Sequence, residues 1–110
     1  MRQLNVYFND RKAGLLTEIL PGNNYRFEYY PTYVRSEFPH ISITLPKSIS
    51  PYESENLFPF FANMLPEGAL RRVVCREHHV DEDDFFGILY AMADVETIGA
   101  VNLKKIENED

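Results

Sequence analysis

A proline and a glycine stand close together in the run Leu65-Pro66-Glu67-Gly68, directly after an apolar stretch. Proline restricts the residue before it, so Leu65 is biased out of the α-helical region and a helix should end there. Glu67 and Gly68 stand where a second helix can begin, with a carboxylate beside its positive end. The sequence therefore predicts two helices joined at a tight corner, and this corner limits the folds that are possible.

Alternating apolar and polar residues predict β-strands before and after the corner. Residues 4–8 and 13–20 flank a run of turn-forming residues and are typical of a β-hairpin. Residues 25–30 alternate in the same way and predict a third strand, and residues 41–45 predict a short fourth strand. A last strand is expected at residues 98–103.

Three helices are expected between the strands, and residues 31–39 are expected to be extended or irregular. The first helix should run from residue 56 or 57 to Leu65, and the second should begin at Glu67. The second helix has an apolar stripe at helical spacing, formed by Leu70, Val73 and Val74. Asp81 can cap the third. The predicted fold class is α+β, a small antiparallel β-sheet with about three helices on one side.

The composition fits one domain with its own core. The chain has 110 residues, of which 45% are hydrophobic, and a chain of this size buries roughly 65% of its unfolded surface in a single domain. We expect this domain to span residues 1–103, followed by a charged tail at 104–110. The net charge of −6 argues against direct binding to nucleic acid, because Lys and Arg provide most non-specific affinity for phosphates.

Other features favour a cytoplasmic protein. The single cysteine, Cys75, cannot form an internal disulfide. The first residues lead into an alternating pattern without the apolar core of a signal peptide. No apolar run approaches the roughly 18 residues needed to span a bilayer. We therefore expect a cytoplasmic chain without membrane contact.

Three local patterns could indicate catalysis or metal binding, and each has a simpler interpretation. His78 and His79 are adjacent, so on a helix their side chains point about 100° apart and are poorly placed to chelate one ion. The run Asp84-Phe85-Phe86-Gly87 has one residue more than a kinase DFG motif, and its helical periodicity indicates core packing. Cys75 is interpreted as a small core residue. We expect no catalytic residue, no metal and no cofactor.

The aromatic residues allow two interpretations. The chain contains seven tyrosines and eight phenylalanines, and these can pack in the core and on the sheet. Some could instead remain accessible and form a surface for a partner protein, because Tyr and Phe are enriched at interfaces. The sequence alone leaves both interpretations open.

Several motifs resemble the N-terminal region of HipA-type proteins, the serine/threonine kinase toxins of bacterial toxin-antitoxin systems. Residues 60–71 are similar to the family signature FFxNLLPEGxxR, with Met64 where Leu is usual. Three further segments are similar to the LSLSLP…PY, DDPFGLL and GAV-x-L runs of the family: residues 41–46 with 51–52, residues 83–89 and residues 99–103. Order and spacing agree, and the resemblance covers nearly the whole chain.

The resemblance implies the fold of the HipA N-terminal subdomain, as a stand-alone HipS-like protein. It also implies a non-catalytic module that docks on a HipA-like serine/threonine kinase core from a separate chain, because the catalytic residues of the family lie in a larger segment after this region. In the tripartite form of these systems such a protein is the antitoxin, and a helix-turn-helix DNA-binding protein can share the complex. We expect partner contacts at Phe61, Asn63, Glu67 and Arg71.

Two alternatives stay open. The chain could be the N-terminal subunit of a split HipA-like kinase that needs it for activity, which keeps the docking and reverses its effect. It could instead be a small metal-dependent hydrolase that uses Glu67, His78 or His79. Co-expression with the kinase separates the first alternative from an antitoxin, and metal analysis of the purified chain tests the second.

Overall fold

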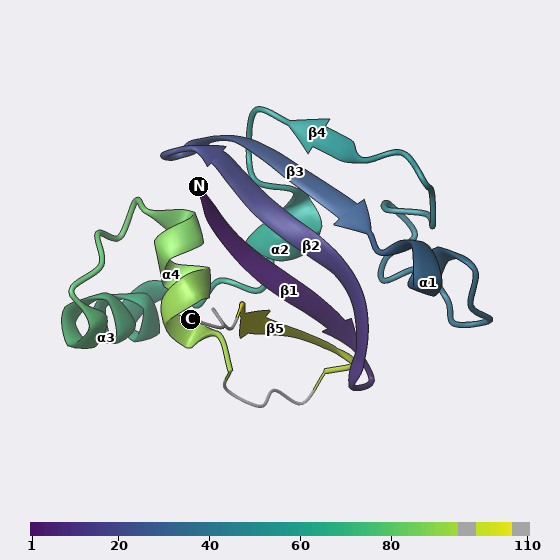
Figure 1. Ribbon diagram of the computed structural model, residues 1–110. Coiled ribbons are helices and arrows are strands. Elements are labelled where there is room, and N and C mark those ends of the chain that lie inside the picture. The colour runs from purple at the N-terminus through teal and green to yellow at the C-terminus, as the bar shows by residue number, and fades with distance from the viewer. Residues whose placement is uncertain (95–98, 107–110) are drawn as a thin grey trace.

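The computed structural model describes residues 1–94 and 99–106, which form a five-stranded antiparallel sheet with the strand order β4-β3-β2-β1-β5 (Figure 1). The elements in chain order are β1 (Arg2–Phe8), β2 (Arg11–Leu20), β3 (Asn23–Tyr29), α1 (Pro31–Val34), β4 (Tyr52–Ser54), α2 (Pro59–Ala62), α3 (Gly68–His78), α4 (Phe85–Met92) and β5 (Val101–Lys105). The α+β class is confirmed, with α1 as an unexpected fourth helix within the described residues. None of the helices described is long and apolar enough to cross a membrane.

The predicted hairpin and third strand are confirmed as β1, β2 and β3. Asn9 and Asp10 connect β1 to β2 with φ angles of 46° and 67°, as a two-residue hairpin turn of type I′ requires. Gly14 in β2 lies very close to β3. A Cβ atom there would come within 2.6 Å of the Glu28 carbonyl oxygen and 2.7 Å of the Phe27 ring, so glycine permits this close approach.

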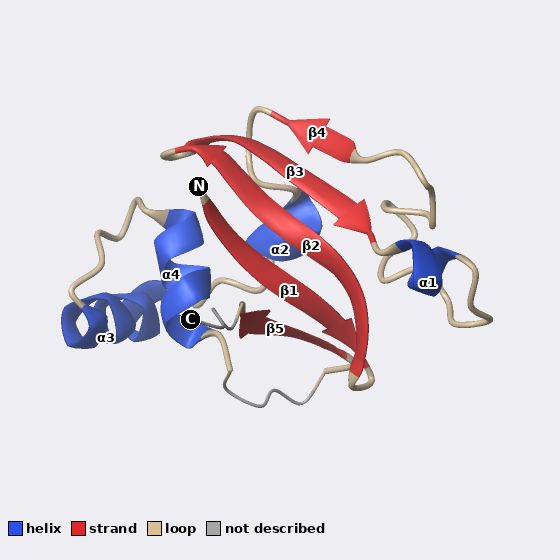
Figure 2. Ribbon diagram, viewed as in Figure 1, coloured by secondary structure: helices blue, strands red, loops and turns tan. Residues whose placement is uncertain are grey.

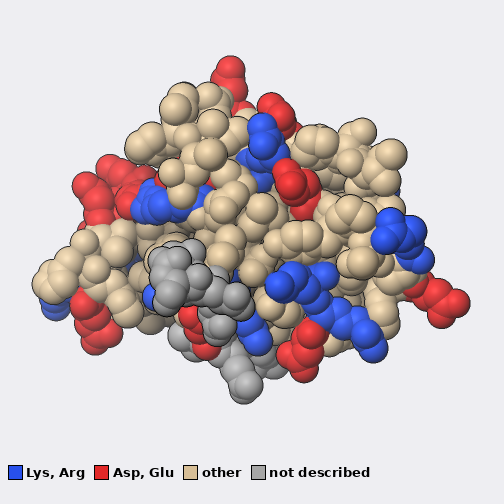
Figure 3. Space-filling model, in the orientation of Figure 1, with Lys and Arg blue, Asp and Glu red and all other residues tan. Residues whose placement is uncertain are grey.

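One face of the sheet carries the core. Phe27 in β3 contacts Phe61 of α2 with ring centres 5.6 Å apart, and Tyr25 contacts Phe86 of α4 at 6.4 Å. Because residues i and i+2 of a strand point to the same face, α2 and α4 cover one face together. Figure 2 shows the strands in front of α2. The face toward the viewer carries charged side chains of both signs (Figure 3).

The prediction of a strand at residues 41–45 is wrong. Ile41 and Leu45 are buried, but Ile43 is 85% exposed, and the segment forms only an isolated bridge. The hydroxyl of Tyr29 explains this, because it accepts a hydrogen bond from the Ile41 N–H at 3.0 Å and donates one to the Leu45 carbonyl. These bonds hold the segment as a turn over the core. The fourth strand is β4, which pairs with β3.

Several element boundaries differ from the prediction, among them the start of α3, which is Gly68 instead of Glu67, and the boundaries of α2 and β5. Helix α2 begins at Pro59 and ends at Ala62, and turn-like bonds then continue to Leu65, whose N–H donates to the Ala62 carbonyl at 3.1 Å. Strand β5 continues to Lys105, past the domain boundary expected at residue 103. The expected start of that strand, Ile98, and the end of the tail lie outside the described residues.

Asp84 caps α4, whereas the sequence predicts Asp81. The Asp84 carboxylate accepts a hydrogen bond from the backbone N–H of Gly87 at 3.0 Å. The Asp81 carboxylate accepts one from the backbone N–H of Asp83 at 3.1 Å, in the loop before the helix. The prediction is wrong because four acidic residues follow one another at 81–84, and spacing alone does not select the one that caps.

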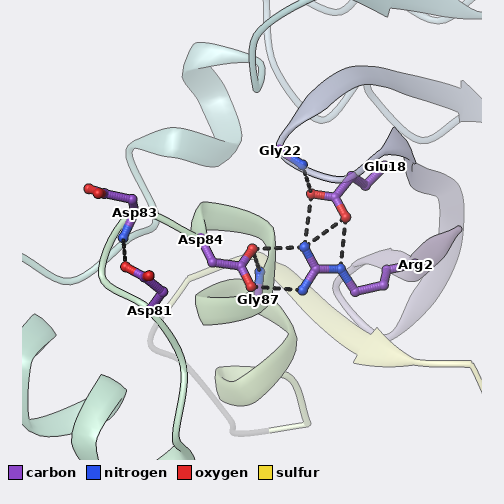
Figure 4. A network of polar contacts seen from close by, with 7 residues as sticks. All are labelled: Arg2, Glu18, Gly22, Asp81, Asp83, Asp84 and Gly87. Atoms are coloured by element: carbon purple, nitrogen blue, oxygen red, sulfur yellow. Dashed lines mark hydrogen bonds and ion pairs between the residues drawn. The ribbon is translucent and has the colours of Figure 1, made fainter.

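Arg2 joins three elements through one guanidinium group (Figure 4). Its Nε donates to Glu18 Oε1 at 2.7 Å and its Nη2 to Glu18 Oε2 at 2.9 Å. Nη1 and Nη2 also donate to the two carboxylate oxygens of Asp84, at 3.0 and 2.7 Å. The Glu18 side chain is only 3% exposed and accepts a further bond from the Gly22 N–H. This network holds the start of α4 against the hairpin, and the sequence did not indicate it.

Replacing Arg2 by methionine should destabilise the fold. The change keeps an unbranched stem but leaves the buried Glu18 carboxylate without its charged partner. We expect the free energy of unfolding, measured by urea denaturation at neutral pH, to fall by roughly 2 kcal/mol. Arg26→Met is the matched control, because Arg26 pairs at 3.4 Å with Glu53, whose side chain is 60% exposed, and its loss should cost less than about 0.5 kcal/mol. Equal costs for the two variants would contradict the role of Arg2.

The same network should make stability depend on pH in the acid range. The hydrogen bonds from Arg2 lower the pKa of Asp84, burial opposes this effect, and the Gly87 N–H adds to it. An unfolded aspartate titrates at about pH 3.9, so the stabilisation is complete above that pH and is lost as the pH falls through the lower pKa of the folded state. Between about pH 5 and about pH 2.5, the free energy of unfolding should fall less in Arg2→Met than in the native chain. A parallel fall in both proteins would show that Asp84 is not linked to Arg2.

Candidate functional site

The corner between α2 and α3 has the shape that the sequence predicts. Leu65 and Pro66 are buried, and Glu67 is extended, with φ of −120° and ψ of 156°. Gly68 follows in the left-handed region with φ of 58° and is the first residue of α3. The Glu67 side chain makes no capping hydrogen bond and is exposed. The corner therefore presents this carboxylate to solvent.

Arg71 holds the corner against α4. Its Nε donates a hydrogen bond to the Pro66 carbonyl at 2.9 Å, and its guanidinium lies 5.7 Å from the centre of the Phe85 ring. Phe85 is the first residue of α4 and is 40% exposed. One half-buried side chain thereby connects the corner, α3 and α4, and fixes the direction in which α3 leaves the corner.

The four residues expected to contact a partner differ in accessibility. Asn63 and Glu67 are exposed, and Arg71 is half-buried. Phe61 is completely buried and packs against Phe27 of the sheet. The structure therefore brings three of these residues to the surface at the corner, while the Phe61 side chain belongs to the core beneath them.

Helix α3 directs much of its predicted apolar stripe toward solvent. Leu70 is 58% exposed and Val73 is 43% exposed, whereas Val74 is half-buried. The buried residue of the helix is Cys75, and α3 packs mainly against α4 at the edge of the molecule (Figure 1). Periodicity identified the stripe, but no sequence signal shows whether other parts of the chain cover it.

A groove of about 450 Å³ borders the segment that contains the corner. Phe60 and Met64 line it, together with Phe8 and Ile41. Phe61, between the first two in the sequence, points into the core instead. The apolar residues before the corner therefore serve two surfaces, the protein core and a groove open to solvent.

The tyrosines pack mainly as core and sheet residues. Tyr25, Tyr29 and Tyr33 are buried, and burial raises the pKa of Tyr29 to about 12. The core interpretation is confirmed for these three. The large hydrophobic side chains that are exposed are mostly aliphatic: Met1, Leu20, Ile43, Ile49, Leu70, Val73 and Phe85. Accessible apolar side chains therefore exist, but they are not the tyrosines that the composition suggested.

Cys75 and His78 lie in the last turn of α3, and His79 follows the helix as its C-cap. Cys75 is buried, and burial raises the pKa of its thiol, so the thiol stays protonated at neutral pH. The interpretation of Cys75 as a core residue is confirmed. His79 ends the helix in the left-handed region with φ of 56°, and its N–H donates to the Cys75 carbonyl. Within residues 1–94 and 99–106, no group of three or more His, Cys, Asp and Glu side chains is placed to hold a metal ion.

The sheet and the corner together match a known family. Residues 4–104 match the HipA N-terminal domain. The chain belongs to this family. A solved structure described as the N-terminal domain of HipA toxin is similar, with a TM-score of 0.71 and 30% sequence identity, and the match covers 99% of this chain and 96% of that chain. A Haemophilus influenzae protein described as uncharacterized is 32% identical over 105 residues, 96% of this chain and 93% of that protein.

Membership in the HipA N-terminal domain family relates this chain to toxin-antitoxin systems, because the solved relative is a domain of a toxin. The fold that the resemblance implied is confirmed by the same structural match. The motif at residues 60–71 forms α2, the corner and the first turn of α3. The segment that carries the family signature is therefore also the segment that directs α3.

The corner of this HipA N-terminal domain should depend on the backbone of Gly68. A Cβ atom there would meet nothing within 4 Å, so the crowding that a glycine corner suggests is absent and the left-handed φ is the constraint. We expect Gly68→Val to lower the free energy of unfolding by roughly 1.5 kcal/mol, measured by urea denaturation. Gly68→Asn should cost less than about 0.7 kcal/mol, because Asn adopts the left-handed region more readily. Equal costs would point to packing instead of backbone conformation.

Proposed function

We propose that this HipA N-terminal domain is a non-catalytic module that binds a separate HipA-like serine/threonine kinase core and regulates it, as the antitoxin of a tripartite toxin-antitoxin system. The observation that carries the proposal is the family match over residues 4–104, with its similarity to a domain of HipA toxin. In HipA-type kinases this domain precedes the kinase core in one chain. A separate chain with the same fold can present the same surface to such a core.

The corner supports this proposal by offering a partly ordered polar surface. Asn63 and Glu67 are exposed there, beside the half-buried Arg71. Arg71 is held by the Pro66 carbonyl and the Phe85 ring, so it has already lost part of its conformational freedom. A side chain ordered in advance loses less entropy when a partner binds. We therefore propose these three residues as kinase contacts, with Phe61 as their buried support.

Regulation requires the module to distinguish between two states of the kinase. A bound protein shifts an equilibrium between active and inactive arrangements only by the difference in its affinity for the two. A difference of about a hundredfold between the dissociation constants for the two states corresponds to about 2.7 kcal/mol of binding free energy. An antitoxin has this preference for the inactive arrangement, and a subunit required for activity has it for the active one.

We assign operator DNA, within this proposal, to a helix-turn-helix protein in the same complex. The net charge of −6 on this chain opposes direct contact with phosphates, because non-specific DNA affinity comes mainly from Lys and Arg. The chain would then reach DNA only through its protein partners.

One observation favours the alternative with the opposite effect. The solved relative is described as a domain of HipA toxin, so a domain of this family can be part of the kinase. In this alternative the chain is the N-terminal subunit of a split kinase, and the kinase core is inactive without it. Both versions require a complex, and they differ in what the complex does.

Co-purification and co-expression should test both parts of the proposal. We expect this chain and the HipA-like kinase core encoded beside it to elute as one complex on size exclusion at micromolar concentration. Co-expression should restore growth that the kinase core alone inhibits. Separate elution with unaltered toxicity would contradict the proposal, and toxicity that appears only on co-expression would establish the split kinase.

A pair of matched substitutions should locate the contact at the corner. Asn63→Lys should weaken the complex by about tenfold or more, because a bulky charge enters the proposed interface. Asn23→Lys is the control, since Asn23 is also exposed but begins β3, and it should change the dissociation constant by less than about twofold. Equal effects would exclude Asn63 as a contact.

A further inference from the structure

Helix α3 carries an apolar row that the described part of the protein leaves open. Of its 11 residues, only Cys75 is buried. Leu70 and Val73, three positions apart and so neighbours on one side of the helix, are 58% and 43% exposed. Figure 3 shows residues other than Lys, Arg, Asp and Glu at the edge of the molecule where Figure 1 places α3, with charged residues beside them.

Two arginines beside this row have no charged partner in the described residues. Arg72 and Arg76 are exposed and one turn apart, and neither takes part in an ion pair or a side-chain hydrogen bond within residues 1–94 and 99–106. Arg2 and Arg26 form ion pairs, Arg71 donates to the Pro66 carbonyl, and Arg35 resembles Arg72 and Arg76 in this respect. Glu77 is the acidic residue of α3. It lies four positions after Val73, on the same side of the helix as Leu70 and Val73, and offsets one of the two arginines. The outward side of the helix is therefore an apolar pair with one carboxylate and a small basic excess, in a chain whose net charge is −6.

We infer that the outward side of α3 is the docking helix of this protein, which lays Leu70 and Val73 into an apolar groove of the kinase-core chain while Arg72 and Arg76 face carboxylates at the rim of that groove. This inference rests on the proposed function and specifies where the kinase core binds. An amphipathic helix in a groove, with its apolar residues as anchors, is a common mode of protein recognition. The charges predict an acidic rim on the partner.

The exposed corner residues extend the same surface. Glu67 directly precedes α3, Asn63 lies before it in the same corner, and both are exposed, so the docking face extends to the corner. One short helix is smaller than the roughly 1,000 Å² that a stable interface buries, and the corner supplies the additional area. The interface we infer therefore combines an apolar centre on α3 with polar contacts at the corner.

Other occupants fit these features less well. The arginines could bind the phosphates of a nucleic acid, but a phosphate backbone offers no apolar surface to the two aliphatic side chains. The net charge of −6 on the chain also opposes the approach of nucleic acid. A second copy of this chain would bring the same small basic excess to both sides of one interface, so the two copies would have no complementary net charge. A kinase-core surface with an acidic rim satisfies both the apolar row and the arginines.

The experiment compares charge substitutions of equal size at two exposed aliphatic sites. Leu70→Glu with Val73→Glu places two carboxylates on the proposed face, and Ile43→Glu with Ile49→Glu places two at side chains that are 85% and 88% exposed elsewhere. Binding to the purified kinase core is measured by calorimetry, and circular dichroism checks that each variant is folded. We expect the first pair to weaken binding by about a hundredfold and the control pair by less than about twofold.

A second comparison tests the arginines. Arg76→Glu should weaken binding by about tenfold or more and reduce its dependence on salt, whereas Arg35→Glu, at an exposed arginine after α1, should do neither. In the native complex, the backbone amides of residues 68–78 should exchange hydrogen more slowly than in the free chain.

The outcomes separate this inference from the proposed function. If the native chain binds the kinase core and the Leu70 and Val73 pair binds equally well, the docking face is wrong and the proposed function stands. If the native chain does not bind the kinase core, the docking face and the proposed function are both wrong. If the native chain is a dimer that the same pair converts to monomers, a second copy occupies the face and the inference is also wrong.

Discussion

The guanidinium of Arg2 is the point on which the arrangement of the helices depends. It connects residues 82 positions apart in the sequence, through two hydrogen bonds to Asp84 at the start of α4. It also neutralises Glu18, which is 3% exposed, and a buried carboxylate is tolerated in a fold only when it is paired and hydrogen-bonded. The hairpin and α4 therefore share one charged centre, and neither can move without breaking bonds to the other.

From this centre, contacts lead directly to the surface proposed to bind the kinase. Asp84 caps α4, and the guanidinium of Arg71 lies 5.7 Å from the ring centre of the next residue, Phe85. Arg71 in turn holds the Pro66 carbonyl at the corner, and α3 begins two residues later. The direction of α3 is thus set by charge and aromatic contacts that start in the first strand.

The sequence predicted features that depend on local chemistry. The alternation of the first three strands and the restriction that Pro66 imposes on Leu65 are both local, and the structure contains these strands and this corner. Long-range contacts were not predictable. The hydroxyl of Tyr29, twelve residues before Ile41, turns an alternating segment into a loop, and no local pattern shows that Arg2 reaches Asp84. Of the candidate site, the sequence located the corner but placed Phe61 among the contacts, because periodicity does not show which of two adjacent phenylalanines enters the core.

The exposure of Leu70 and Val73 matters for association more than for folding. These side chains contact water in the unfolded chain and remain 58% and 43% exposed after folding. They therefore add only part of the roughly 1.5 to 3 kcal/mol that complete burial of such a side chain is worth. A helix of 11 residues is only marginally stable by itself, and α3 is held mainly through Cys75, Val74 and Arg71. A partner that covers the outward side would therefore gain apolar burial and also restrain a weakly held helix. Such a helix can respond to its partner without disturbing the sheet, since the Arg2 network fixes α4 independently of what covers α3.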